Sequence, residues 1–133
     1  MKLVFIIILS IATSFVCASN EDLARAANEN PFLNGELNPK YEGQKTALAG
    51  EILEIKSTTQ NFPIYKLNTR LKGINAVWVT SIAPAPSGGI KVGDMLIFKG
   101  FITTSAGLDS TGKLETLIQG KTLLMAIQAQ RAN

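Results

Sequence analysis

The chain has 133 residues, a formal charge of +3, one cysteine and no histidine. The cysteine is residue 17, inside an apolar N-terminal stretch, so the rest of the chain has neither thiol nor imidazole. Those groups supply the commonest nucleophiles, general bases and zinc ligands of enzymes. The composition therefore argues against thiol-dependent, histidine-dependent and zinc-dependent catalysis, and it provides no disulfide after residue 18.

The first 18 residues, MKLVFIIILSIATSFVCA, are typical of a secretory signal peptide. Lys2 gives the positive start, an apolar run follows, and small residues allow cleavage after Ala18. The run is shorter than the roughly 20 residues that a membrane-spanning helix needs. The residues before Cys17 fit a lipoprotein signal poorly. We therefore expect a periplasmic or secreted protein, without a lipid anchor and without a transmembrane segment in the mature chain.

Residues 19–44 are predicted to form a short helix followed by a flexible leader. The helix is expected over 19–28, with Ser19 or Asn20 as its cap and acidic residues in its first turn. Two Asn-Pro steps and one Asn-Gly step mark residues 29–44 as a loop. The side chains of this leader that could still dock on a folded domain are Phe32, Leu33 and Tyr41.

Charge is distributed unevenly along the chain. Residues 19–44 carry two cations and five acids, whereas residues 45–133 carry ten cations and five acids. A basic domain behind an acidic leader is compatible with a polyanionic partner. A charge of this size is also ordinary for a soluble domain, so the balance alone does not select a ligand.

The domain over 45–130 has the pattern of an all-β fold. Strands are expected over 46–57, 62–70, 76–82, 94–104 and 114–128. The alternation in the first strand changes phase near Gly50, which indicates a bulge or sharp bend. The spacing of Leu117, Lys121, Leu124 and Gln128 also fits a helix, so strand and helix both stay open over 117–128. A bent first strand and four others predict a small five-stranded closed barrel, because closure hides the strand edges.

Three segments resemble the OB-fold family: ALAGEILEI as a bent first strand, VWVTS as the third and IKVGDMLIFKGFI as the fourth. The resemblance is closest to small exported bacterial OB proteins and to the OB modules of anticodon-binding and other nucleic-acid-binding proteins, and it covers about residues 45–130. It implies an OB-like barrel that binds ligands on its second and third strands.

The chain departs from this family between its third and fourth strands. Many members have a helix there, but this chain has IAPAPSGG, in which proline and glycine prevent one. Helix-free variants exist within the family. The departure leaves an SH3-like barrel as the alternative architecture.

No catalytic set is evident in the sequence. Glu51 and Glu54 are three residues apart on an expected strand, so their carboxyl groups point to opposite faces. Asp94 is interpreted as a turn residue rather than as an acid or a metal ligand. No phosphate-binding glycine loop or serine nucleophile motif occurs. We expect no enzymatic activity, no cofactor and no metal.

The expected binding face lies on the outside of the second and third strands. If Val77 and Val79 fill the barrel, Trp78 faces outward and shares a face with Lys66. An aromatic ring beside cations is used to bind single-stranded nucleic acid and would also suit an acidic glycan or a peptide. The predicted ligand-binding residues are Lys66, Arg70, Lys72, Trp78, Thr80 and Lys91.

Two features of this face remain open at the level of sequence. A lone tryptophan in a small domain is often buried, so Trp78 could instead lie in the core or beneath the leader. The fourth strand is apolar on both faces, because Met95, Ile97 and Phe101 alternate with other apolar residues. Its outer side must be covered by the leader, a second subunit or a partner.

The sequence therefore predicts an exported, non-catalytic OB-fold binding protein of the bacterial envelope or extracellular space. Its ligand is expected to be a protein or a polyanion, either nucleic acid or acidic glycan. The alternative is a single-stranded nucleic-acid-binding OB protein. Export argues against an intracellular nucleic-acid substrate and favours a protein or envelope partner.

Overall fold

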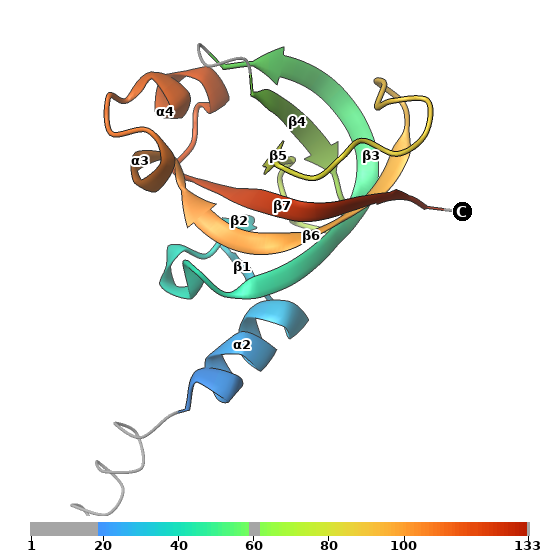
Figure 1. The fold of residues 1–133 in the computed structure, drawn as a ribbon. Coiled ribbons are helices and arrows are strands. Elements are labelled where there is room, and N and C mark those ends of the chain that lie inside the picture. Colours follow the sequence, from blue (N-terminus) through green and yellow to red (C-terminus); the bar gives the residue numbers. More distant parts are fainter. Residues whose placement is uncertain (1–18, 59–61, 133) are drawn as a thin grey trace, which may run out of the picture.

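A computed structural model describes residues 19–58 and 62–132, and the predicted signal peptide lies outside these residues. The main body is a closed barrel of five strands in the order β3-β4-β5-β7-β6 (Figure 1). The strands are β3 (Lys45–Ser57), β4 (Pro63–Asn68), β5 (Val77–Ser81), β6 (Met95–Thr104) and β7 (Thr122–Arg131). The all-β fold class with a five-stranded barrel is therefore confirmed.

The long first strand β3 pairs with two different strands along its length. Its first half pairs with β6 and its second half with β4, and the register shifts between Ile52 and Glu54. The bulge thus lies a few residues beyond Gly50, close to the position that the phase change predicts. A bulge adds local bend and twist, which lets one strand form part of two sides of a small barrel.

The last strand β7 closes the barrel. It runs antiparallel to β6 over most of its length and parallel to β5 over Val79–Ser81. The prediction of one strand over 114–128 is wrong for its first part. Helix α4 (Lys113–Ile118) precedes β7, and the helix α3 (Ser105–Leu108) precedes α4. The helix ends at Ile118, and residues from Thr122 onward form the expected strand. Leu114, Leu117 and Ile118 lie on one side of α4, where they pack in an apolar cluster.

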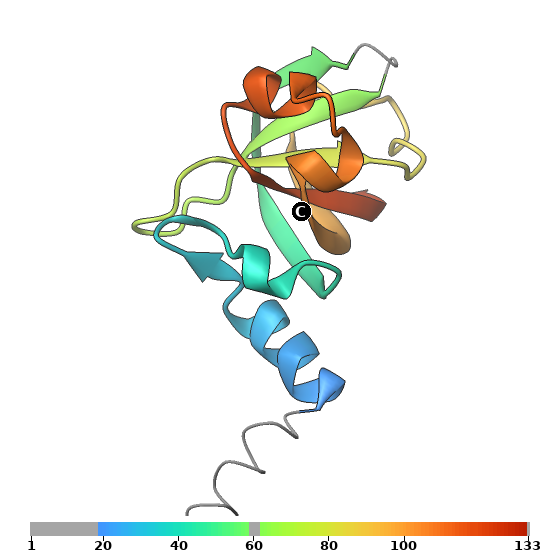
Figure 2. The ribbon, with the colours of Figure 1, turned by 90° about the vertical axis from the view of Figure 1, so that its left-hand side faces the viewer.

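Residues 19–44 have more structure than a flexible leader. Helix α2 (Asn20–Glu29) begins at the cap Ser19, as predicted, and is followed by a hairpin of β1 (Phe32–Leu33) and β2 (Glu36–Leu37) and by the 3₁₀ turn η1 (Pro39–Tyr41). Ala27 and Leu37 are buried in the barrel core, with Phe32 and Tyr41 packed beside them. Leu33, by contrast, stays exposed. The segment closes one end of the barrel (Figure 2).

The loop between β5 and β6 contains no helix, as the prolines and glycines predict. Its far end is fastened by Arg131, which donates to the carbonyl oxygens of Ser87 at 2.9 Å and Gly89 at 2.6 Å. Arg131 also pairs with Asp94 at 3.1 Å. Asp94 accepts a hydrogen bond from the backbone of Lys91, and these bonds lower its pKa. Asp94 is therefore a turn residue, in agreement with its predicted role.

Candidate functional site

Strands β4 and β5 have one face inside the barrel and one face outside. Tyr65, Leu67, Val77 and Val79 belong to the barrel core, where the rings of Tyr65 and Phe98 stack with centroids 5.7 Å apart. The side chains that alternate with them along the two strands point outward: Ile64, Lys66, Trp78 and Thr80. The predicted direction of the two valines and of the indole is correct, because the strand period of two leaves no other arrangement.

The indole of Trp78 is nevertheless not at the surface. Only 9% of the residue is exposed, and it belongs to a second apolar cluster outside the barrel. The cluster consists of Ile64, Trp78, Leu114, Ile118 and Leu123, with Leu117 against it. The expectation of an exposed indole is wrong. Helix α4 covers the indole of Trp78, rather than the barrel wall or the N-terminal leader.

Two ammonium groups lie over the Trp78 ring. Lys56 Nζ is 5.3 Å and Lys66 Nζ is 5.7 Å from a ring centroid, within the range of cation–π attraction. Lys66 pairs directly with Trp78 across β4 and β5. Lys56 also donates to the carbonyl oxygen of Leu117 at 3.2 Å, near the end of α4. The predicted pairing of Lys66 with Trp78 is present, and Lys56 is a neighbour that the sequence reading missed.

The other predicted site residues are not gathered around this ring. Arg70 forms an ion pair with Glu51 at 2.7 Å. Lys72 and Lys91 are exposed on two different loops, one before β5 and one before β6. Thr80 lies on the same face as Trp78 and lines a cleft beside α4. The structure thus joins Lys66, Trp78 and Thr80 and leaves the remaining three apart.

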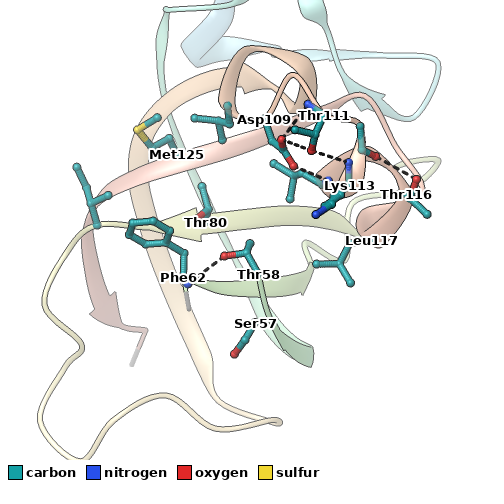
Figure 3. A pocket seen from close by; sticks show the side chains of 14 residues that line it. Ser57, Thr58, Phe62, Thr80, Asp109, Thr111, Lys113, Thr116, Leu117 and Met125 are labelled. Atoms are coloured by element: carbon teal, nitrogen blue, oxygen red, sulfur yellow. Dashed lines mark hydrogen bonds between the residues drawn. The ribbon is translucent and has the colours of Figure 1, made fainter. Parts of the chain in front are cut away.

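The cleft has a volume of about 720 Å³ and opens between three segments of the chain (Figure 3). Ser57 ends β3, and Thr58 and Phe62 lie in the connection to β4. Thr80 and Met125 come from β5 and β7, and Ile82 directly follows β5. The wall opposite is formed by residues of α3, α4 and the turn between them: Leu108, Asp109, Thr111, Gly112, Lys113, Leu114, Thr116 and Leu117. Figure 3 shows Phe62 and Met125 on one side and Asp109, Thr111 and Leu117 on the other.

The lining of this cleft is mostly apolar with hydroxyl groups. Phe62, Ile82 and Leu108 are exposed to 48%, 64% and 40%, which is unusual for side chains gathered in one hollow. Among the described residues that line it, Asp109 and Lys113 are the charged ones. A site of this composition suits apolar side chains and hydrogen-bonding groups better than a row of phosphates or sulfates.

Asp109 is occupied by the turn that starts α4. Its carboxylate accepts from the backbone and hydroxyl of Thr111 and from the backbone N–H of Leu114. These hydrogen bonds, those from Thr111 first, lower the pKa of Asp109. The carboxylate is therefore a structural acceptor that is ionised at neutral pH, rather than a proton donor for catalysis.

A second cavity of about 290 Å³ lies on the opposite side of α4's C-terminal end. It is lined by the β2 hairpin, the chain before β5 and residues 118–122, and it includes Lys66, Trp78 and Ile118. Among the residues that the structure describes, no group of three or more acidic or cysteine side chains could hold a metal ion. Over those same residues, no helix has the length and apolar character to cross a membrane.

Comparisons with known proteins show that solved structures resemble this chain in fold. No family model and no curated protein sequence matches the chain. Among solved structures, OBody AM1L10 bound to hen egg-white lysozyme has a TM-score of 0.51 at 17% identity, over 77% of this chain and 92% of that chain. OBody AM3L15 bound to the same lysozyme has a TM-score of 0.52 at 17% identity, over 77% and 88%. The likeness supports an OB-like barrel.

Proposed function

We propose that this protein is an exported, non-catalytic binding protein that takes a protein partner on the outer face of β4 and β5, with the 720 Å³ cleft as its binding site. The observation that carries the proposal is the cleft itself. Three half-exposed apolar side chains surround it, and its floor consists of strand residues held in place by the barrel. Exposed apolar groups in one concave site favour binding of another apolar surface.

The distribution of the cations favours a protein partner over a polyanion. Arg70 is paired with Glu51, Lys56 is bonded to α4, and Lys72 and Lys91 lie on separate loops. Polyanion sites need several cations along one track, because each neutralised phosphate adds to the affinity. The OBody chains named above are bound to lysozyme, which supports a barrel of this shape as a scaffold for protein recognition.

Single-stranded nucleic acid or an acidic glycan is the second candidate. The specific observation in its favour is the pair of ammonium groups of Lys56 and Lys66 over the Trp78 ring. A base or sugar could stack on that ring only after α4 had moved, because the indole is 9% exposed. Its binding would weaken steeply with added salt.

Selection of peptides tests the primary proposal. A library of random peptides displayed on phage is panned against the chain from residue 19, and a selected peptide is synthesised. We expect its affinity to fall at least about tenfold in Ile82→Glu, because a charge at the cleft rim opposes an apolar ligand. Val92→Glu is the matched control, since Val92 is 62% exposed and does not line the cleft.

Salt separates the two candidates. We expect the selected peptide to bind equally well at low and high salt, and oligo-dT to bind weakly in both. Equal loss of peptide binding in Ile82→Glu and Val92→Glu would contradict the cleft as the site. Tight, salt-sensitive binding of oligo-dT that is lost in Lys66→Ala would replace the protein partner with a polyanion.

Export is part of the proposal and rests on the N-terminal sequence. The positive start, the apolar run and the small residues before position 19 support cleavage by signal peptidase. The test is N-terminal sequencing of the protein after expression in a bacterial host with fractionation. A start at Ser19 in the periplasm or medium is expected, and a cytoplasmic chain that starts at Met1 would overturn export.

A further inference from the structure

Helix α4 stands in the middle of the outer β4–β5 face, with a cavity on each side. Leu114 and Leu117 of α4 line the large cleft, and Ile118 at its other end lines the 290 Å³ cavity. Trp78 lies beneath the helix and also lines the smaller cavity. The two cavities and the surface under α4 therefore belong to one face of the barrel, divided by six residues of helix.

Helix α4 packs against the outer β4–β5 face in the way that a bound helical peptide would. Its two buried side chains, Leu114 and Ile118, are four residues apart and so lie on the same side of the helix. Both enter the apolar cluster with Trp78. Such i, i+4 apolar pairs are the usual anchors of a short helix in a groove. Lys56 adds one polar contact, to the carbonyl oxygen of Leu117.

The segment that carries α4 is fastened at its base. Ser105 donates its backbone N–H to the carbonyl of Lys121 at 2.9 Å and its hydroxyl to the carbonyl of Gly120 at 3.2 Å. Thr104 and Thr122 pair as the last residues of β6 and the first of β7. Residues 106–119 thus leave and return to the barrel at one point, so their removal breaks no strand pairing.

Left-handed residues bound the helix at both ends. Gly112 has a φ of 82° and Gln119 a φ of 53°, so the chain turns sharply just before and just after α4. Gln119 has a side chain in a region that favours glycine, which costs free energy. A six-residue helix is also far too short to be stable without its packing. Its position therefore depends on the contacts that it makes with the face.

We propose that α4 is an intramolecular occupant of a docking groove and that a partner segment of the same chemistry replaces it. The partner segment is a short amphipathic helix with two apolar side chains one turn apart and acidic side chains beside them. The apolar pair would take the places of Leu114 and Ile118 against Trp78. The acidic groups would face Lys56 and Lys66. This inference rests on the proposed function, in which a protein partner binds this face.

Charge on the face supports acidic side chains in the partner. Lys66 has no carboxylate within ion-pair distance among the described residues, and Lys56 has Glu54 at 3.6 Å. Lys121 adds a third ammonium at the rim of the smaller cavity, where Glu36 is the one acid among the described lining residues. As α4 leaves, carboxylates on the incoming segment would meet these ammonium groups. The exposed Glu115 of α4 itself forms no ion pair with them.

The first test removes the occupant. In a variant of the chain from residue 19, a short glycine-serine linker replaces residues 106–119 between Ser105 and Gly120. Trp78 is the only tryptophan, so its emission reports on the groove directly. We expect cooperative unfolding to be retained, the emission to move to longer wavelength, and quenching by acrylamide to rise severalfold.

The second test returns the occupant as a separate molecule. A synthetic peptide of residues 109–120, DSTGKLETLIQG, is added to the linker variant and to the intact chain. We expect the peptide to restore short-wavelength emission in the linker variant and to bind it at least about tenfold more tightly than the intact chain, whose own α4 competes. The control peptide carries alanine in place of Leu114 and Ile118 and should not bind.

A second variant tests the same proposal if the linker variant does not fold. Leu114→Ala with Ile118→Ala in the intact chain should expose Trp78 to acrylamide and leave one cooperative transition. Loss of cooperative unfolding in both variants would overturn the proposal, because α4 would then be part of the fold. Unchanged emission in both, or equal affinity of the peptide for both chains, would overturn it too.

These outcomes are separable from the proposed function. The emission and peptide experiments use no outside ligand, so they can fail while the phage-selected peptide still binds the cleft in an Ile82-dependent manner. A static α4 with a functional cleft would restrict the partner to the 720 Å³ site. If α4 can be displaced but panning selects no peptide, the groove under α4 would stand as a binding site and the 720 Å³ cleft would not.

Discussion

Gly100 lies where β6 meets the irregular part of β7. The register between these strands shifts between Lys99 and Gly100, and the Gly100 backbone lies directly against that of β7. A Cβ at this position would meet the carbonyl oxygen of Met125 and the Cα of Ala126. The residue without a side chain thus allows the two strands to approach at the point where β7 turns toward β5.

Gly100→Ala should therefore destabilise the barrel. We expect the free energy of unfolding to fall by about 1–3 kcal/mol, because the two backbones must separate to admit a methyl group. Urea unfolding measures the change. Gly120→Ala is the control, since its nearest neighbour is an ordinary 3.8 Å contact, and it should stay within about 0.5 kcal/mol of the parent. Equal stability of Gly100→Ala and the parent would contradict the close approach.

At the scale of elements, the loop over 83–93 is held by a residue far away in the sequence. Arg131 at the end of β7 binds two carbonyl oxygens of this loop and the carboxylate of Asp94. The planar guanidinium of arginine reaches three acceptors at once. The compact ammonium group of a lysine cannot do so with the same geometry. The connection between β5 and β6 is thus a clamped loop without a helix.

Arg131→Ala should release this loop without unfolding the barrel. We expect a protease of broad specificity to cut within 83–93 several times faster, and the thermal midpoint to change little, because the bonds are solvent-exposed. Mass spectrometry of the fragments locates the cuts. Arg131→Lys should restore little of the protection. Unchanged cleavage in Arg131→Ala would show that proline and glycine, rather than the clamp, fix the loop.

The alternation within the strands could be predicted from the sequence, whereas the cover over Trp78 could not. Val77 and Val79 must share a face because a strand has a period of two, and this determined the direction of the indole. Leu114 and Ile118 form an apolar pair that fits helix or strand over so short a span. The cleft escaped prediction because three segments that are distant in the sequence contribute its residues.

At the scale of the whole molecule, the N-terminal segment and the barrel share one core. Ala27 of α2 is fully buried in the same cluster as Leu48 and Phe98, which line the barrel. The acidic segment that precedes the barrel is therefore part of the domain and not a tether. Unfolding should follow one transition in which α2 and the barrel are lost together.

Ala27→Asp tests this shared core. A buried, unpaired carboxylate should lower the free energy of unfolding of the whole domain by more than about 1 kcal/mol. Far-ultraviolet circular dichroism and Trp78 emission should report the same shifted midpoint. Asn28→Asp is the matched control, because it places the same carboxylate at the next, exposed position of the helix, and it should change the midpoint little. A loss of helix signal with an unchanged Trp78 midpoint would mean that α2 unfolds independently.

The position of β7 determines when the protein can acquire its shape. β7 is the last strand along the chain, yet it lies between β5 and β6 and joins them. The contacts that complete the structure therefore link residues far apart in sequence, which makes folding slow. Until residues 122–131 have paired with them, β5 and β6 keep unpaired edges, and the barrel cannot close.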